Sequence, residues 1–272
     1  MKKNDRGYRM NGRVLVVAGS DSGGGAGIQA DVKTITVLGG FATTAITALT
    51  AQNTKSITSV QVMPAHFVAE QMRVVISDIG VDCIKTGMLQ NRDIIEAVVE
   101  VLGEISPKVP LIVDPVMISK SGVGLLEKDA QQALISQVFP ILDLITPNIP
   151  EAEVFSGKTI SCIDDMLFAV ELIKNAGARA VLLKGGHLDG DTLFDVLVCD
   201  EGEFVFQDKR IDSINTHGTG CTLSSAIAVG IAHGLGHKEA VIQARNYLRK
   251  AIIEAPDFGS GHGPVNHGVT LK

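Results

Sequence analysis

The sequence predicts an α/β fold, with a mostly parallel central sheet and helices on both faces. Short runs of β-branched residues alternate with longer stretches whose apolar residues recur at helical spacing. Strands that alternate with helices in this way usually pair in parallel. The chain has 272 residues, 45% of them hydrophobic, which is enough for one sizeable core. We therefore expect a single domain over residues 13–272, preceded by a frayed tail at residues 1–12.

The individual elements follow from local pattern. Seven β-branched runs predict strands: residues 13–18, 41–47, 82–85, 111–113, 142–146, 180–184 and 193–198. Seven stretches with apolar residues at helical spacing, several opening with proline or an acidic residue, predict helices: residues 31–38, 64–78, 92–102, 128–138, 163–176, 220–233 and 238–254. In a parallel sheet ligands bind beyond the carboxyl ends of the strands, so the loops there are the first place to seek a site.

Composition excludes several classes of protein. The formal net charge is -6 and no dense basic run occurs, so a nucleic-acid partner is not expected. No apolar run reaches the ~20 residues needed to cross a bilayer, and the N-terminus lacks the apolar stretch of a signal peptide. The four cysteines are widely spaced and match no zinc-ligand pattern, which fits a reducing compartment. These features predict a cytoplasmic protein without membrane or nucleic-acid partners.

The first glycine-rich loop, residues 19–27, follows a predicted strand and contains a G-x-G-x-x-A match at residues 25–30. A dinucleotide site also needs an acidic residue ~20 positions later, yet no Asp or Glu lies between Asp31 and Glu70. We therefore reject a dehydrogenase. A Walker A loop is absent too, because Ala152 stands where the first glycine before Gly157, Lys158 and Thr159 is required.

A second glycine motif, Thr-His-Gly-Thr-Gly-Cys-Thr at residues 216–222, opens an apolar helical stretch. Backbone N–H groups of residues 218–221 would converge at a helix N-terminus, where unpaired donors and the helix dipole attract phosphate. A plain helix entry with threonine as its cap is an equally good interpretation of this motif alone.

A second loop favours the phosphate interpretation. Asn148 and Glu151 are three residues apart, so they can face the same side of a helix start and order water around a magnesium–nucleotide complex. An ordinary capping arrangement would use the same two residues. The presence of both motifs in one chain favours nucleotide binding.

Seven segments together resemble the hydroxymethylpyrimidine and phosphomethylpyrimidine kinases of thiamine biosynthesis, within the ribokinase superfamily. They are AGSDSGGGAGIQAD (18–31), TALTAQNT (47–54), KTGML (85–89), DPVM (114–117), TPNIPE (146–151), LKGGH (183–187) and THGTGCT (216–222). The resemblance extends from Val14 to His267 and implies a ribokinase-like fold. It also implies ATP as co-substrate, Mg²⁺, a homodimer, and phosphorylation of 4-amino-5-hydroxymethyl-2-methylpyrimidine first to the monophosphate and then to the diphosphate.

The resemblance implies pyrimidine contacts at Gly19, Asp31, Gln52, Met88 and Val116, with Cys221 near the reacting hydroxyl. A glutamine such as Gln52 offers a donor and an acceptor that match a ring nitrogen and an exocyclic amine. Asp31 could accept from the amine or hold the hydroxymethyl group, although a carboxylate that stabilises the first turn of a helix is as good an interpretation. Met88 and Val116 would form apolar walls, or simply belong to the core.

The wider superfamily has an aspartate where this chain has Cys221, which leaves the catalytic base open. A helix N-terminus lowers a cysteine pKa, so we expect Cys221 to be partly thiolate and able to accept the hydroxyl proton.

On the phosphate side we expect contacts from Lys184, Thr216, Gly218, Thr219 and Gly220. Asp114 would organise the metal through water, together with Asn148 and Glu151, and His187 could line the nucleotide side. A solvated loop role is the alternative for Asp114, Thr216 and His187. Residues 120–124 are expected to form a mobile flap that closes over the substrate.

Two other functions compete with this assignment. A pyridoxal kinase shares the glycine loops, but residues 51–54, Ala-Gln-Asn-Thr, resemble the pyrimidine branch. A non-catalytic pyrimidine-binding sensor would keep the pocket and lose the nucleotide apparatus, whose residues are all present. Turnover and ATP binding with magnesium would discriminate among the three.

Overall fold

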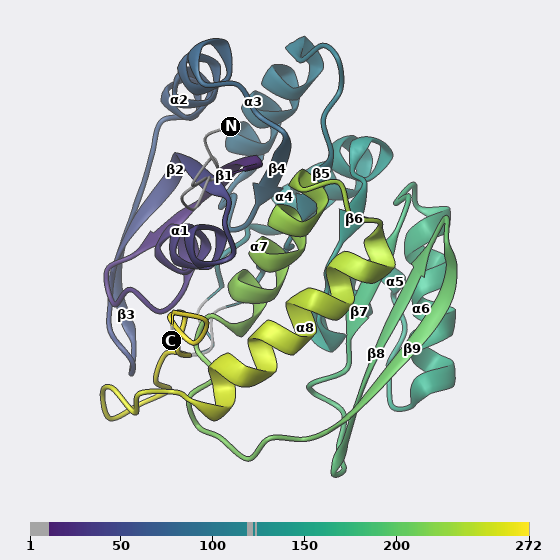
Figure 1. Cartoon of the computed structure of the whole chain (residues 1–272). Coiled ribbons are helices and arrows are strands. Elements are labelled where there is room, and N and C mark those ends of the chain that lie inside the picture. Colours follow the sequence, from purple (N-terminus) through teal and green to yellow (C-terminus); the bar gives the residue numbers. More distant parts are fainter. Residues whose placement is uncertain (1–10, 119–121, 123, 272) are drawn as a thin grey trace, which may run out of the picture.

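The computed structural model describes residues 11–118, 122 and 124–271. Within these residues, nine strands form one sheet in the order β3-β2-β1-β4-β5-β6-β7-β8-β9 (Figure 1). The strands are β1 Arg13–Asp21, β2 Phe41–Gln52, β3 Ile57–Val62, β4 Cys83–Thr86, β5 Leu111–Val113, β6 Leu144–Ile145, β7 Val181–Lys184, β8 Thr192–Cys199 and β9 Gly202–Lys209. The six central strands, from β2 to β7 in space, pair in parallel. The outer pairings β2–β3, β7–β8 and β8–β9 are antiparallel.

Helices cover both faces of the sheet. They are α1 Gly27–Val37, α2 Ala65–Asp78, α3 Arg92–Glu104, α4 Lys128–Ala133, α5 Ile149–Ser156, α6 Ile163–Asn175, α7 Thr219–Ala232 and α8 His237–Ile253. A π-helical turn, Leu134–Val138, and a 3₁₀ turn, Phe139–Ile141, continue α4. Figure 1 shows α1, α7 and α8 together on one face, while α2 to α6 pack on the other. The predicted α/β class and mostly parallel sheet are confirmed.

The strand pattern explains the two layers of core. Successive side chains of a strand point to opposite faces, and in β1 Leu15 and Val17 join the apolar cluster under α2 to α6, whereas Val14 and Val16 join the cluster under α1, α7 and α8. All four side chains are completely buried. A strand buried on both faces reads as a continuous apolar run, which is why the sequence revealed it.

All seven predicted strands and all seven predicted helices are present, and all except the strand at residues 111–113 have shifted ends. The sequence did not predict β3, β9 or α5. The helix expected at residues 31–38 begins earlier, at Gly27, and this shift changes the surroundings of Asp31. Of the expected flap at residues 120–124, only Gly122 and Gly124 are described, so that prediction lies mostly outside the described residues.

The predicted tail also falls mostly outside the described residues. Its last two residues touch the fold: the Asn11 N–H donates to the Gly39 carbonyl at 3.0 Å, and the Gly12 carbonyl accepts from the Phe41 N–H at 2.9 Å. None of the described helices is long and apolar enough to cross a membrane.

Candidate active site

A cavity of about 580 Å³ lies where the parallel strands end. Loops that follow β1, β2, β4, β5, β6 and β7 line it, together with the first turn of α7. Every site residue proposed from the sequence except Asp31 lines this cavity. The lining residues that were proposed are Gly19, Gln52, Met88, Asp114, Val116, Asn148, Glu151, Lys184, His187, Thr216, Gly218, Thr219, Gly220 and Cys221.

The first turn of α7 is built by a close approach of two glycine loops. Gly218 is the residue before the helix, in the left-handed region with φ 80°. A Cβ there would lie 1.9 Å from the carbonyl oxygen of Gly25, so only glycine fits. Gly218, not a threonine side chain, occupies the capping position. In this turn the Thr219 N–H donates to the Thr216 carbonyl at 3.4 Å, and the N–H groups of Gly220 and Cys221 belong to residues that line the cavity.

Two acidic side chains and one lysine also line the cavity, and a Cβ on Gly220 would lie 3.4 Å from Asp114 Oδ2 and 3.6 Å from Lys184 Nζ. Lys184 Nζ is 3.2 Å from Asp114 Oδ1, and Asp114 is 2% exposed. Burial, reinforced by the Asp114 charge and opposed by Lys184, raises the pKa of Glu151 to about 7. Two buried carboxyl groups therefore lie near one lysine.

Asn148 and Glu151 also form the capping box of α5. The Asn148 side chain accepts from the Glu151 N–H at 2.9 Å, and the Glu151 carboxylate accepts from the Asn148 N–H at 2.8 Å. The ordinary capping interpretation is thus correct. Because both residues also line the cavity, capping fixes the carboxylate in place and does not exclude a second use.

Asp31 requires a correction. It is fully buried, does not line the cavity, and pairs with the equally buried Lys85 at 2.9 Å. Ser225 Oγ donates to the same carboxylate oxygen at 2.6 Å. Since α1 begins at Gly27, Asp31 falls in the second turn, on the face that packs against the sheet and α7. In this position it cannot contact a ligand in the cavity.

The expected pKa of Cys221 was also wrong. Burial is the largest effect and raises the pKa of this thiol to about 12, although the nearby Lys85 opposes that change. A partly thiolate Cys221 at neutral pH is therefore not supported. The helix N-terminus is present, but desolvation outweighs it.

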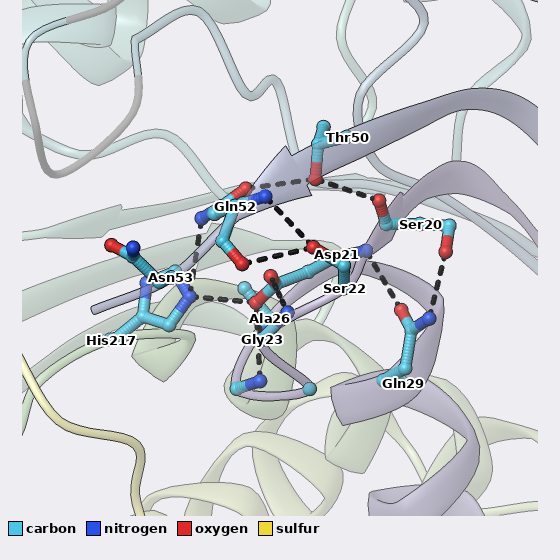
Figure 2. Close-up of polar contacts among 12 residues, drawn as sticks. Ser20, Asp21, Ser22, Gly23, Ala26, Gln29, Thr50, Gln52, Asn53 and His217 are labelled. Atoms are coloured by element: carbon cyan, nitrogen blue, oxygen red, sulfur yellow. Dashed lines mark hydrogen bonds and ion pairs between the residues drawn. The ribbon is translucent and has the colours of Figure 1, made fainter. Parts of the chain in front are cut away.

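Sequence reasoning missed a polar network between the two glycine loops (Figure 2). Asp21 accepts from the N–H groups of Gly23, Gly25 and Ala26 at 2.8 to 3.1 Å, which shapes the first glycine loop. Its Oδ2 also lies 2.8 Å from His217 Nε2. A signal existed in the sequence, because an aspartate just before a glycine run commonly bonds to backbone donors ahead of it.

The same network reaches the candidate pyrimidine end of the cavity. Gln52 Nε2 lies 3.4 Å from His217 Nε2, and Gln52 Oε1 accepts from Thr50 Oγ1 at 3.1 Å (Figure 2). Gln52 is thus held by neighbours on one side while it faces the cavity. The pairing joins segments far apart in sequence, which local pattern cannot reveal.

A third missed group supports the loop after Lys184. Asp195 accepts from the Gly185 N–H at 2.9 Å and is paired with Arg245 of α8. Gly185 approaches β8 so closely that a Cβ would lie 2.0 Å from the Phe194 carbonyl oxygen. Asp195 and Arg245 both line the cavity. Through its bond to Gly185, Asp195 holds the backbone that directly follows Lys184.

Comparison with known proteins decides the family. The family model described as phosphomethylpyrimidine kinase matches residues 21–266. The chain belongs to this family. Its members are kinases, and their relatives carry names from thiamine biosynthesis.

Two relatives illustrate the family match. The hydroxymethylpyrimidine/phosphomethylpyrimidine kinase of Rhizobium meliloti is 44% identical over 95% of this chain and 97% of its own length. The thiamine biosynthesis bifunctional protein of Geobacter sulfurreducens is 48% identical over 94% of this chain. This chain spans 52% of that longer relative.

Solved structures of related kinases confirm the ribokinase-like architecture. The Staphylococcus aureus pyridoxal kinase in complex with AMP-PCP and pyridoxal superposes with a TM-score of 0.86, at 34% identity, over 95% of this chain and 94% of its own. Kinases named for pyridoxal and kinases named for hydroxymethylpyrimidine are thus both similar to this chain. Sequence identity to the pyrimidine kinases is higher.

Proposed function

We propose that this kinase transfers a phosphoryl group from ATP to 4-amino-5-hydroxymethyl-2-methylpyrimidine, and from a second ATP to the resulting monophosphate. The observation that carries the proposal is one cavity with two chemically different ends. Gln52, Met88 and Val116 line it from the strand ends and loops of β2, β4 and β5, and Lys184 and the first turn of α7 line it from the other half of the sheet. A family match over residues 21–266 supports the substrate.

At the pyrimidine end, the Gln52 amide would pair with a ring nitrogen and the amine of the substrate. Met88 is 7% exposed and packs with Ala48 and Leu125, so the apolar wall has support behind it. Gly19 passes close to this wall, since a Cβ on it would lie 3.0 Å from the Met88 sulfur. Gly19 and Met88 are therefore in contact, and a flat ring would lie against the wall that they form together.

At the phosphate end, the N–H groups of residues 218–221 would hold the transferred phosphoryl oxygens. Thr216 and Lys184 would contact the nucleotide phosphates. Lys184 suits this role because the Asp114 and Glu151 carboxylates favour its charged form, although burial acts in the opposite direction.

Mg²⁺ fits the acidic excess of Asp114 and Glu151, which with Asn148 would hold it through water. Bound there, the ion would neutralise phosphate charge. Because Cys221 carries its proton at neutral pH, we assign it contact with the hydroxyl and not proton removal. A loose phosphoryl-transfer transition state needs little help from a base.

The decisive experiment is magnesium–ATP turnover with hydroxymethylpyrimidine, its monophosphate and pyridoxal as separate substrates, with mono- and diphosphate products resolved. We expect diphosphate from the first two and a loss of at least tenfold in kcat/KM with Gln52→Ala. Gln61→Ala, an exposed glutamine on β3, is the control.

The other outcomes identify the competing functions. Turnover of pyridoxal alone would make this chain a pyridoxal kinase, an alternative favoured by the likeness to the Staphylococcus aureus enzyme. Tight pyrimidine binding without turnover would make it a sensor.

We further propose a cytoplasmic homodimer. Strand β3 is an edge of the sheet, and Leu49 of the neighbouring β2 is 44% exposed, so a second copy has an apolar and partly unpaired face to cover. Light scattering after size exclusion would give twice the chain mass of 28.7 kDa if this is correct.

A further inference from the structure

Three side chains of metal-ligating type meet outside the cavity. Cys199 ends β8, Glu201 lies in the turn to β9, and His237 is the first residue of α8. One ligand atom of each, Sγ, a carboxylate oxygen and a ring nitrogen, lies within 4.8 Å of the others. None of the three lines the cavity. Cys199 lies beside the amino end of β7, whereas the cavity lies at the carboxyl end of that strand.

The Cys199 sulfur is buried near two backbone N–H groups. Cys199 is 5% exposed, and burial raises the pKa of its thiol, while the N–H groups of Glu201 and Gly202 act in the opposite direction. The tight turn, in which Cys199 pairs directly with Gly202, brings these donors into place. Backbone donors to sulfur stabilise the deprotonated form that a metal requires.

The other two groups have capacity left for a metal. Glu201 Oε1 accepts weakly from the Lys238 N–H at 3.2 Å, which leaves Oε2 for another partner. No hydrogen bond from the His237 ring is found among the described residues, so its ring nitrogens are available to a metal. A neutral imidazole is the form that binds metal.

Charges of both signs surround this cluster. Asp143, Glu201 and Asp200 act on His237, as does Arg179, and Lys174 acts on Asp200. Arg179 pairs with Asp143 at 3.2 Å and Asp200 at 2.6 Å, so the Glu201 carboxylate lies outside these ion pairs.

We propose that Cys199, Glu201 and His237 form a binding site for Zn²⁺ or a similar borderline-soft divalent ion, with water as fourth ligand. Sulfur, nitrogen and carboxylate oxygen in this number suit zinc. Ligand atoms of a tetrahedral zinc lie roughly 3.5 Å apart, so modest rotation of Glu201 and His237 closes the site. Binding releases the Cys199 thiol proton to solvent.

The site would fasten the β8–β9 turn to the start of α8. Its role would be structural, because it lies away from the cavity. The sequence does not reveal it as a metal motif, since His237 is 38 positions after Cys199, far outside the usual zinc-ligand spacing.

Titration of the full chain with Co²⁺, in the absence of Mg²⁺, tests the proposal. We expect one equivalent to bind with a thiolate-to-cobalt charge-transfer band that Zn²⁺ displaces. Cys199→Ser should abolish the band, and His237→Asn or Glu201→Gln should weaken binding at least tenfold. All three variants should keep wild-type magnesium–ATP turnover.

Cys162→Ser is the matched control, because Cys162 is the exposed cysteine among the described residues. Its band should be unchanged. Absence of the band in the wild-type chain, or its persistence in Cys199→Ser, would overturn the proposal. His237 and Glu201 are not fully buried, so their variants test the site even if Cys199→Ser proves unstable.

Discussion

The ion pair of Asp31 and Lys85 is sealed from solvent beneath the first turn of α7. Both side chains have no exposed surface, and the second carboxylate oxygen of Asp31 has no hydrogen-bond partner. Burial acts to lower the pKa of Lys85, but the nearby Asp31 charge raises this pKa above its usual range. The pair joins α1 to β4, and Ser225 extends it to α7.

Replacing Asp31 with Asn should therefore reduce stability. The substitution leaves the Lys85 charge buried without its partner, which costs about 3–5 kcal/mol of the free energy of unfolding. Urea unfolding followed by circular dichroism measures this change. Glu96→Gln, which breaks an exposed pair with Arg92, should cost no more than about 0.5 kcal/mol. Unchanged stability with a raised KM for the pyrimidine would instead assign Asp31 to the substrate.

Glu151 gives the chain a specific pH dependence. Its pKa rises from an ordinary 4.5 to about 7 on folding, mainly through burial. Between these values the folded chain binds more protons at this site than the unfolded chain does. The contribution of Glu151 to the free energy of unfolding is therefore fully present below pH 4.5. It falls by up to about 3 kcal/mol as the pH rises through 7.

Glu151→Gln should remove that loss, since glutamine keeps the capping hydrogen bond and does not ionise. We expect the variant to gain stability relative to the wild-type chain at pH 7.5 but not at pH 5, by urea unfolding at both values. The exposed Glu100→Gln should show no such difference. Equal changes at the two pH values would contradict the raised pKa.

At the scale of elements, the approach of the two glycine loops fixes the proposed phosphate-binding turn. Gly218→Ala would place a Cβ against the Gly25 carbonyl and force alanine into the left-handed region. The N–H groups of the first turn of α7 must then shift, and we expect kcat/KM for ATP to fall on the order of 100-fold.

Gly103→Ala is the matched control for this substitution. A Cβ at Gly103 meets nothing within 4 Å, and this residue lies within α3. Alanine there should leave turnover unchanged and slightly raise stability. If Gly218→Ala retained full kcat/KM, this turn would not hold phosphate.

The elements differed in how well sequence predicted them, for physical reasons. Most central strands are buried on both faces and consist of apolar runs, so they were found. Strands β3 and β9 contain no fully buried residue and alternate polar residues such as Gln61 and Gln207 with apolar ones, and they were missed. Helix α5 was missed because its eight residues, which include Pro150, are too few for a clear period.

Site prediction failed where side-chain direction mattered. The loop residues gather because parallel strands end at one edge, which sequence predicts well. The sequence placed Asp31 at the start of its helix, but α1 begins four residues earlier, so Asp31 lies one turn further from the loop, on the buried face of the helix. The contact of Asp21 with His217 spans 196 positions and needed the structure.

At the scale of the whole molecule, the cavity joins contributions from both ends of the chain. Gln52, Met88 and Val116 come from the half of the sheet that contains β1 to β5, whereas Lys184 comes from β7 and the phosphate donors from α7. If the two ends bind separate ligands, each ligand should stabilise the folded chain by itself. A ligand at 100 times its Kd adds about 2.7 kcal/mol.

For a chain of this size that gain raises Tm by roughly 5–10 °C. Differential scanning calorimetry should show such a rise with magnesium–ATP alone and with hydroxymethylpyrimidine alone. Gly218→Ala should lose the rise with ATP and keep the rise with the pyrimidine, whereas Gln52→Ala should do the reverse. Loss of both rises in either variant would mean that the cavity acts as one indivisible site, because the phosphate and pyrimidine ends would then depend on each other for their shape.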